Sequence, residues 1–253
     1  DKTSIDLITP LTISTATGYA SQVLNAGEMT NKGWEVAGWL SPVKTDNFEW
    51  RIDVNWAQNE NEVTKLPSGL QNILLASVQG GVTINARLGE PYGTIEGTNF
   101  VFTDGQKTVN STSGPGTRRG KYLISPTTEI LGSFQPDWKG GLNNTFTYKS
   151  LKFSFLLDMQ KGGEVFSLDQ WYGQATGLYP ESVGNNDLGN PVRNSIRYLP
   201  GTTNLDPSYP HGGVILPGVK QDGTPNDLRA SMDNYANAYG YARVPNAMHV
   251  YDA

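Results

Sequence analysis

Apolar and polar residues alternate strictly over two long segments of this sequence, one ending near residue 57 and the other near residue 160. Successive side chains of a β-strand point to opposite faces, so each segment has one apolar, largely aromatic face and one polar face. The arms run for about ten to twelve residues, whereas strands of soluble proteins average five or six. The pattern therefore predicts an all-β, antiparallel fold built from long hairpins.

The first hairpin is expected over about residues 33–59, with a turn at Pro42–Asn47, where Pro, Asp and Asn favour a connection. The expected apolar face consists of Trp34, Val36, Leu40, Phe48, Trp50, Ile52, Val54 and Trp56. The expected polar face consists of Glu35, Glu49, Arg51, Asp53 and Asn55. The first arm alternates less cleanly than the second, because Trp39 falls on the polar side.

The second hairpin is expected over about residues 138–162, around a two-residue turn at Lys149–Ser150. Its apolar face consists of Phe146, Tyr148, Leu151, Phe153, Phe155, Leu157 and Met159. Its polar face consists of Lys152, Ser154, Asp158 and Gln160. Asn144 falls on the apolar side, and a bulge near Gly140–Gly141 could shift the register there.

The length of these arms favours a membrane-spanning β-barrel, because a strand tilted through a bilayer needs roughly 9–11 residues. Trp and Tyr near the strand ends are typical of the aromatic girdles of such barrels. The polar segments of about 60–137 and 163–253 would be outer loops, and both tight turns would be periplasmic. Residues 60–137 then contain zero or two spanning strands, and we favour zero, with Tyr92–Phe102 forming β structure above the rim.

The same counting makes Thr3–Thr9 the top of an ascending strand and places Ala253 just before a descending one. About five strand pieces cannot close a membrane barrel, since the smallest have about eight. The sequence also starts at Asp1 directly in strand-like residues. We therefore expect a processed or truncated piece of a longer polypeptide, whose sheet edges pair with strands outside it.

Composition excludes several other classes of protein. The net charge of −5 disfavours nucleic-acid binding, and the absence of Cys excludes disulfides and thiolate chemistry. The sequence contains no run of 18 apolar residues that would form a transmembrane helix. At 37% hydrophobic residues, the chain is too apolar for intrinsic disorder.

Five blocks in order resemble the late barrel of SusC-like (SusC/RagA-type) TonB-dependent transporters. They are DKTSIDLITP, NAGEMTNKGWEVAGWLSP, FEWRIDVNWAQNENEVTKL, GEPYGTIEGTNF and PDWKGGLNNTFTYKSLKFSFLLDMQKGGEVFS, and the final HVYDA resembles the segment before the next strand. The resemblance implies the C-terminal part of a barrel of about 22 strands in the outer membrane of a Gram-negative bacterium.

The resemblance also implies import of oligosaccharides or peptides, with a SusD-like surface lipoprotein as a lid and energy supplied through TonB. The family's plug domain, TonB box and closing strands have no counterpart in these 253 residues. We expect them elsewhere in the full polypeptide or in another chain of the assembly.

Little in the sequence points to catalysis, a cofactor or a metal. His211 and His249 lie in loop-like sequence, and we interpret His211 as a solvated loop residue. Asp53 and Asp158 resemble a glycosidase pair only in composition, and a hydrated lumen wall explains them better. The stretch DGTPND at 222–227 lacks the ligand spacing of a calcium loop.

Loop aromatics are the better candidates for contact with cargo or a lid, because aromatic faces stack on sugars and anchor interfaces. The alternative is that they pack the loops together, and Arg193 and Arg197 could equally hold the loop by pairing with Asp187. The contact candidates are Trp171, Tyr172, Tyr179, Arg193, Arg197, Tyr235, Tyr239 and Tyr241.

Two other functions remain open from the residues alone. A secreted β-sandwich that binds glycans would bury the apolar faces between two sheets. A non-energised porin would explain the hairpins as well as an importer does.

Overall fold

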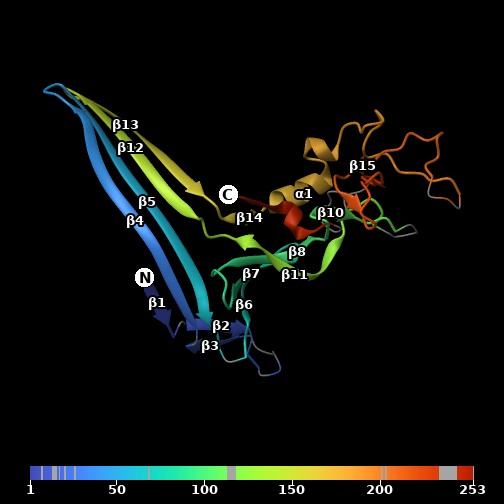
Figure 1. The fold of residues 1–253 in the computed structure, drawn as a ribbon, viewed down its shortest axis with the longest axis horizontal. Coiled ribbons are helices and arrows are strands. Elements are labelled where there is room, and N and C mark those ends of the chain that lie inside the picture. The colour runs from blue at the N-terminus through green and yellow to red at the C-terminus, as the bar shows by residue number, and fades with distance from the viewer. Residues whose placement is uncertain are drawn as a thin grey trace.

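The computed structural model describes residues 1–253 except 7, 13–15, 17, 20, 26, 68, 113–117, 201, 203, 234–243 and 253. Its largest element is a five-stranded antiparallel sheet in the order β1-β4-β5-β12-β13. The strands are β1 (Lys2–Ile5), β4 (Glu28–Lys44), β5 (Phe48–Lys65), β12 (Trp138–Tyr148) and β13 (Leu151–Lys161). The two long hairpins lie side by side and carry their tight turns at the same end (Figure 1).

The expected hairpin of residues 33–59 corresponds to β4–β5, and each of these strands is longer than the alternation indicated. The expected hairpin of residues 138–162 corresponds to β12–β13. Lys149 has a φ of 52° in the two-residue turn between Tyr148 and Leu151, as a tight hairpin requires. Thr3–Thr9 falls on β1 and on the start of β2 (Ile8–Thr12), which pairs with β3 (Ser21–Asn25).

Residues between β5 and β12 contribute no strand to the five-stranded sheet, because β12 pairs directly with β5 from Lys139↔Ala57 to Tyr148↔Phe48. They form a separate four-stranded sheet instead, in the order β11-β8-β7-β6. Its strands are β6 (Asn72–Val78), β7 (Val82–Arg87), β8 (Thr94–Phe100) and β11 (Ile124–Ser133). The sequence pattern indicated only β8, and register shifts interrupt the pairing of β11 with β8 and of β6 with β7.

The second outer segment is less irregular than expected, because it contains the helix α1 (Leu168–Thr176). Ser167 caps the helix through a hydrogen bond from the backbone N–H of Gln170, and Gly177 ends it with a φ of 84°. The other elements are short: β9 (Phe102–Thr103), β10 (Gln106–Val109), β14 (Glu164–Phe166), η2 (Pro180–Ser182), β15 (Val214–Ile215), β16 (Val219–Lys220), β17 (Arg229–Ala230), η4 (Asn246–His249) and β18 (Val250–Asp252).

Most of the described core lies in this outer part, and a second, smaller cluster joins Val63 near the end of β5 to Ile73 of β6 and Ala86 of β7. The main cluster joins β8, β10 and the segment after α1. The cluster consists of Phe100, Val109, Tyr122, Val192, Leu216, Ala230 and Met232. The outer part thus folds on its own apolar contacts, at the end of the hairpins opposite the tight turns (Figure 1).

Candidate functional site: a two-faced β wall and the cavity above it

Paired residues form rows across the four long strands, and all residues of a row lie on the same face of the sheet. The row through Ile52 joins Leu40, Asn144 and Phe155, and the row through Val54 joins Gly38, Leu142 and Leu157. All fifteen residues expected on the apolar side share one face. Val43, which was not among them, joins that face after a register shift in β4 between Leu40 and Val43. All nine residues expected on the polar side share the other face.

No second layer of the described residues covers the apolar face. Trp34 is 75% exposed, Leu151 69% and Phe153 61%. Aromatic rings lie against one another across the strands, as for Trp50 and Phe146, whose centroids are 5.7 Å apart and nearly parallel. A single-layer sheet with such a face is not stable in water, since strands must bury their apolar side against another protein layer or a hydrocarbon environment.

The apolar band has a sharp limit along β5. It runs over nine residues from Phe48 to Trp56, and the same face then continues with the polar Gln58 and Glu60. Trp34 and Trp56 lie at one border, and Phe48 and Tyr148 lie at the other. The band therefore has about the length that a tilted strand needs to cross a bilayer, with aromatic residues at both borders.

Asn144 lies within the apolar band, and the bulge at Gly140–Gly141 that the sequence left open is not present. Pairing of β12 with both neighbours is continuous through these glycines. Asn144 is buried because Trp50 covers it, and its side-chain oxygen accepts a 3.1 Å hydrogen bond from Trp50 Nε1. A polar side chain on the apolar face is thus satisfied locally, without a change of register.

The opposite face contains charged groups that pair with one another. Arg51 donates from Nε and one terminal nitrogen to Asp53 at 2.9 and 2.6 Å. The same guanidinium lies 4.6 Å from the ring centroid of Trp39, which explains how this exposed Trp is accommodated among polar residues. Glu49 accepts a hydrogen bond from Ser41 at 3.1 Å.

A groove of about 570 Å³ crosses this part of the sheet. Glu35, Asn55, Lys139 and Asp158 contribute to its lining. Gly140, which has no side chain, also contributes to the lining, whereas the side chain of Asn55 covers Gly141. Asn55 and Asp158 belong to the polar face, so charged and amide groups line a shallow wet groove there.

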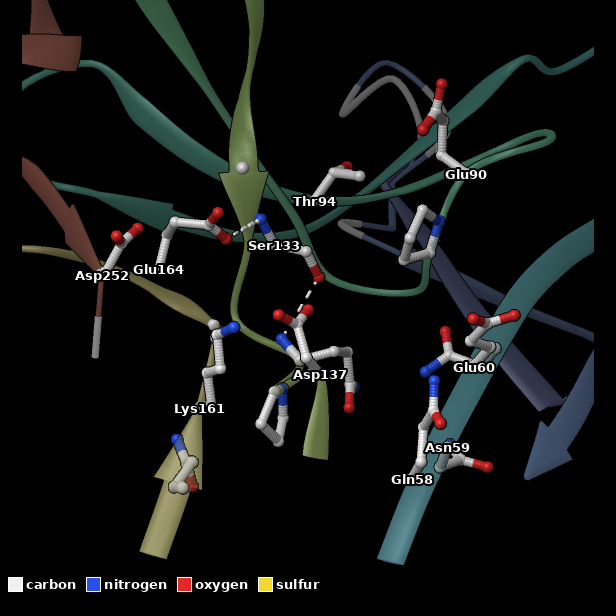
Figure 2. Close-up of a pocket in the computed structure, with 18 of the residues that line it drawn as sticks. Gln58, Asn59, Glu60, Glu90, Thr94, Ser133, Asp137, Lys161, Glu164 and Asp252 are labelled. Carbon is white, nitrogen blue, oxygen red and sulfur yellow. Dashed lines mark hydrogen bonds between the residues drawn. The ribbon is translucent and has the colours of Figure 1, made fainter. Parts of the chain in front are cut away.

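Above the wall lies a larger cavity of about 830 Å³ (Figure 2). It forms because β12 begins at Trp138, whereas β5 continues to Lys65 without β12 as a neighbour. The edge of β5 is instead bonded to residues 89–90, through Val63 N–H to Glu90 O at 3.0 Å and Gly89 N–H to Val63 O at 2.8 Å. The small sheet is thereby fixed above the gap between β5 and β13.

The cavity is lined mainly by carboxylates and amides, and its charged groups are Glu60, Glu90, Asp137, Glu164, Asp252 and Lys161. Glu164 accepts a 2.7 Å hydrogen bond from the backbone N–H of Ser133, which ties β14 to the end of β11 (Figure 2). Glu60 lies across the cavity on β5 (Figure 2). Such a lining can accept hydrogen bonds from hydroxyl, amide or ammonium groups of a hydrophilic solute.

The loop aromatics expected to make contacts divide into buried and accessible residues. Trp171 is only 6% exposed and packs against Phe166 with ring centroids 6.2 Å apart, so its role is loop packing. Tyr172 is 38% exposed. The Tyr179 hydroxyl donates to Asp169 at 2.6 Å, and this bond raises the pKa of Tyr179. Tyr235, Tyr239 and Tyr241 lie outside the described residues.

The ion-pair partner of Asp187 is Arg229 and not Arg193 or Arg197, the alternative that the sequence left open. Asp187 accepts two hydrogen bonds from Arg229, at 2.7 and 2.8 Å, and this bonding lowers the pKa of Asp187. Arg193 donates to the Ala175 carbonyl at 3.3 Å at the end of α1. Arg197 lies over the ring of Tyr209, 4.5 Å from its centroid. The partner of Asp187 is 42 residues away in sequence, which a local search does not find.

Both histidines are buried, which corrects the interpretation of His211 as solvated. His211 Nδ1 accepts a 3.2 Å hydrogen bond from Arg197 N–H, and Nε2 lies 2.7 Å from the Asp206 carbonyl. His249 has no exposed surface, and burial lowers its pKa to about 4. In the DGTPND stretch, the Asp222 carboxylate accepts hydrogen bonds from Thr224 N–H and Oγ1, which makes it a turn.

The described residues contain neither a candidate metal site nor a membrane-spanning helix. No group of three or more His, Cys, Asp or Glu residues there could hold a metal ion. None of the helices in that part of the chain is both long and apolar enough to span a membrane.

Together, the long antiparallel hairpins, the banded apolar face and the polar opposite face define a segment of an antiparallel transmembrane β-barrel with a large outer domain. Solved structures agree on the fold. A structure of the RagAB peptide transporter matches with a TM-score of 0.53 and 19% identity, covering 68% of this chain and 19% of that one. The RagAB peptide importer in its "closed-closed" state matches with a TM-score of 0.52 and 20% identity, over the same shares.

The homologues of this chain are TonB-dependent receptors, which confirms the resemblance to SusC-like proteins. TonB-dependent receptor P26 of Formosa agariphila is 31% identical over 183 residues, which cover 66% of this chain and 18% of the receptor. Receptor P3 of the same organism is 29% identical over 179 residues, covering 64% of this chain and 18% of the receptor. No family model matches the sequence. The chain thus spans about a fifth of the length of the receptors that it matches.

Proposed function

We propose that this chain forms part of the wall and outer domain of a TonB-dependent importer in the outer membrane of a Gram-negative bacterium. The observation that carries the proposal is the apolar band of the five-stranded sheet, which no described residue covers. A β-sandwich would cover that face with a second sheet, so the glycan-binding sandwich has no support in the structure. Homology to TonB-dependent receptors favours an energised importer over a simple porin.

In this proposal the fifteen residues of the apolar face contact lipid, and the nine residues of the polar face line the lumen. The paired charges Arg51–Asp53 keep the wall hydrated without leaving an isolated charge. Trp34 and Trp56 mark the outer membrane–water interface, and the 830 Å³ cavity lies beyond it, on the path of an incoming solute. No step in this role requires catalysis, a cofactor or a metal.

The rest of the machinery would belong to the complete assembly. We place the plug and the TonB connection outside this chain, and a SusD-like lipoprotein lid over the outer domain. Oligosaccharides or peptides are the cargo in this proposal. The fold shared with a peptide transporter supports peptides. The carboxylates and amides around the cavity are suited to either class, because both present hydroxyl or N–H donors.

Paired cysteine substitutions in the full receptor test the wall. Ser154 and Phe155 are neighbours on β13 that point to opposite faces, and the chain has no Cys of its own. In intact cells, Ser154→Cys should react with a small water-soluble maleimide, whereas Phe155→Cys should react only after detergent solubilisation. Equal labelling of the two variants in intact cells would contradict the proposal.

Uptake by cells that carry the full receptor tests the energised import. Labelled oligopeptides and oligosaccharides should accumulate in the periplasm only when TonB is present, and one cargo class should dominate. Accumulation that is unchanged without TonB would favour a porin.

A further inference from the structure

The 3-10 turn η4 (Asn246–His249) connects several elements of the outer domain, by which we mean the described residues between β5 and β12 and those after β13. Asn246 Oδ1 accepts hydrogen bonds from Thr98 N–H at 2.9 Å and from Thr98 Oγ1 at 2.8 Å, which attaches the turn to β8. Asn246 Nδ2 donates to the Gly80 carbonyl at 2.8 Å, at the turn between β6 and β7. These contacts join residues that are about 150 positions apart in sequence.

The other end of the turn is attached to α1 and to the start of the next strand. The His249 carbonyl accepts a 2.9 Å hydrogen bond from Ser167 N–H, directly before the helix. Val250, the next residue, pairs with Phe166 in the β14–β18 ladder. Release of η4 would therefore remove at once the contacts that connect β8, the start of α1 and β18 to one another, while β8 stays paired with β7 and β11.

His249 lies at the centre of this junction, with its side chain fully buried. Neither ring nitrogen has a hydrogen-bond partner among the described residues, although one of them carries a hydrogen in the neutral ring. A neutral imidazole tolerates such a site at a moderate cost, whereas an imidazolium would be a buried charge with two unsatisfied donors. The site therefore admits only the neutral form of the ring.

Among the described residues, no charged group is positioned to stabilise an imidazolium there. Burial is the cause of the lowered pKa of His249, which is about 4. The ionisable groups on the neighbouring elements have other hydrogen-bond partners or are exposed. Glu96 of β8 bonds to Arg87, Asp169 of α1 to Tyr179, and Glu181 of η2 to Gln174. Glu164 of β14 bonds to Ser133 N–H and Tyr251 of β18 to Gln170, and Asp252 is exposed. Glu96 also points away from η4, since the adjacent Gly97 faces Asn246.

We propose that His249 is an acid-sensitive latch: protonation of its buried ring releases η4 from β8 and α1 and opens the outer domain above the wall. In neutral solution the latch is closed and β18 is held in place. In acid, the His249 ring of the opened turn is in water and binds a proton, whereas the buried ring of the closed turn stays neutral. The equilibrium then shifts toward the open form as the pH falls.

Hydrogen exchange of the full receptor in detergent, corrected for the intrinsic pH dependence of exchange, tests the latch. With a pKa of 6.5 in the open form and about 4 in the closed form, protection of residues 165–177 and 244–252 should fall on the order of 30-fold between pH 6.5 and 4.5. Protection should return on neutralisation. The β12–β13 hairpin should keep its protection, which separates a local opening from global acid unfolding.

His249→Phe keeps a ring of similar size that cannot ionise, so its protection should change less than about twofold over the same range. If the His249→Phe variant does not assemble, His249→Gln, which is also neutral, provides the same comparison. His211→Gln is the matched control and should retain the wild-type acid response, because the ring nitrogens of His211 already have partners. An unchanged wild-type protection at pH 4.5, or an equal loss in the His249→Phe variant, would overturn the proposal.

Discussion

The indole N–H of Trp50 donates a 3.1 Å hydrogen bond to the side-chain oxygen of Asn144, which lies in the middle of an otherwise apolar band. The two residues are 94 positions apart and sit on adjacent strands. Water could solvate an amide at this place in a soluble protein, but a hydrocarbon environment could not. The stability that this hydrogen bond provides should therefore depend on whether lipid or water surrounds this face of the sheet.

Trp50→Phe should destabilise the receptor by about 1–3 kcal/mol, because it keeps an aromatic ring but leaves the Asn144 amide without its donor. Adding Asn144→Leu should restore most of the loss, since the unpaired group is then gone. Urea unfolding of the full receptor in lipid vesicles measures both variants. A double variant as unstable as Trp50→Phe alone would argue against a desolvated Asn144.

Arginine substitutions on β13 should separate the two faces of the sheet. Phe155 lies at the centre of the apolar band, opposite Asn144, so Phe155→Arg should cost about 2–4 kcal/mol at the bilayer mid-plane. Ser154→Arg, one residue away on the polar face, should change stability by less than about 0.5 kcal/mol. Unfolding in vesicles compares the two, and similar costs on both faces would contradict the membrane assignment.

Adjacent aromatics on α1 should respond differently to truncation. Trp171 is buried against Phe166, so Trp171→Ala should destabilise the outer domain by about 3–5 kcal/mol. Tyr172 is partly exposed, so Tyr172→Ala should leave folding nearly intact and act, if at all, on cargo or lid binding. Limited proteolysis of the outer domain reports the first effect and cargo binding the second. Rapid proteolysis of the Tyr172 variant would show that this residue also serves packing.

The ion pair between Asp187 and Arg229 should stabilise the loop after α1 in a pH-dependent way. Hydrogen bonds from Arg229 lower the pKa of Asp187, so the stabilisation is present above the carboxyl's ordinary pKa and is lost as the pH falls through the lowered value. In the wild type this loss of stability should occur below about pH 4, and Asp187→Asn should abolish it.

The same substitution should cost about 1–3 kcal/mol at neutral pH, because it leaves the nearly buried Arg229 without its counter-charge. Asp227→Asn is the control: its pair with Lys220 is mostly exposed, so the cost should be about 0–1 kcal/mol. Hydrogen exchange of residues 186–230 compares the variants. Equal effects of the two substitutions would show that burial of Arg229 does not matter.

Local alternation was sufficient to predict both long hairpins, because strand faces repeat every two residues and each arm is long enough to show the period. It failed where elements are short or depend on distant partners. The strands β6, β7 and β11 carry no clean period, and α1 is a nine-residue helix whose signals are Ser167 at its start and Gly177 at its end. The alternation also left open a bulge at Gly140–Gly141, and the structure has none there, because a hydrogen bond from Trp50 accommodates Asn144 without a change of register.

The sequence by itself determined which residues share a face of the wall and how long the apolar band is, since both follow from the backbone geometry of a single strand. Only the tertiary structure decided that β12 lies against β5, that Asp187 pairs with Arg229, that Trp171 is buried and that His249 has no exposed surface. Burial and ion pairing depend on which segments meet in space, and residues such as Asn246 and Thr98, 148 positions apart, meet only once the chain has folded.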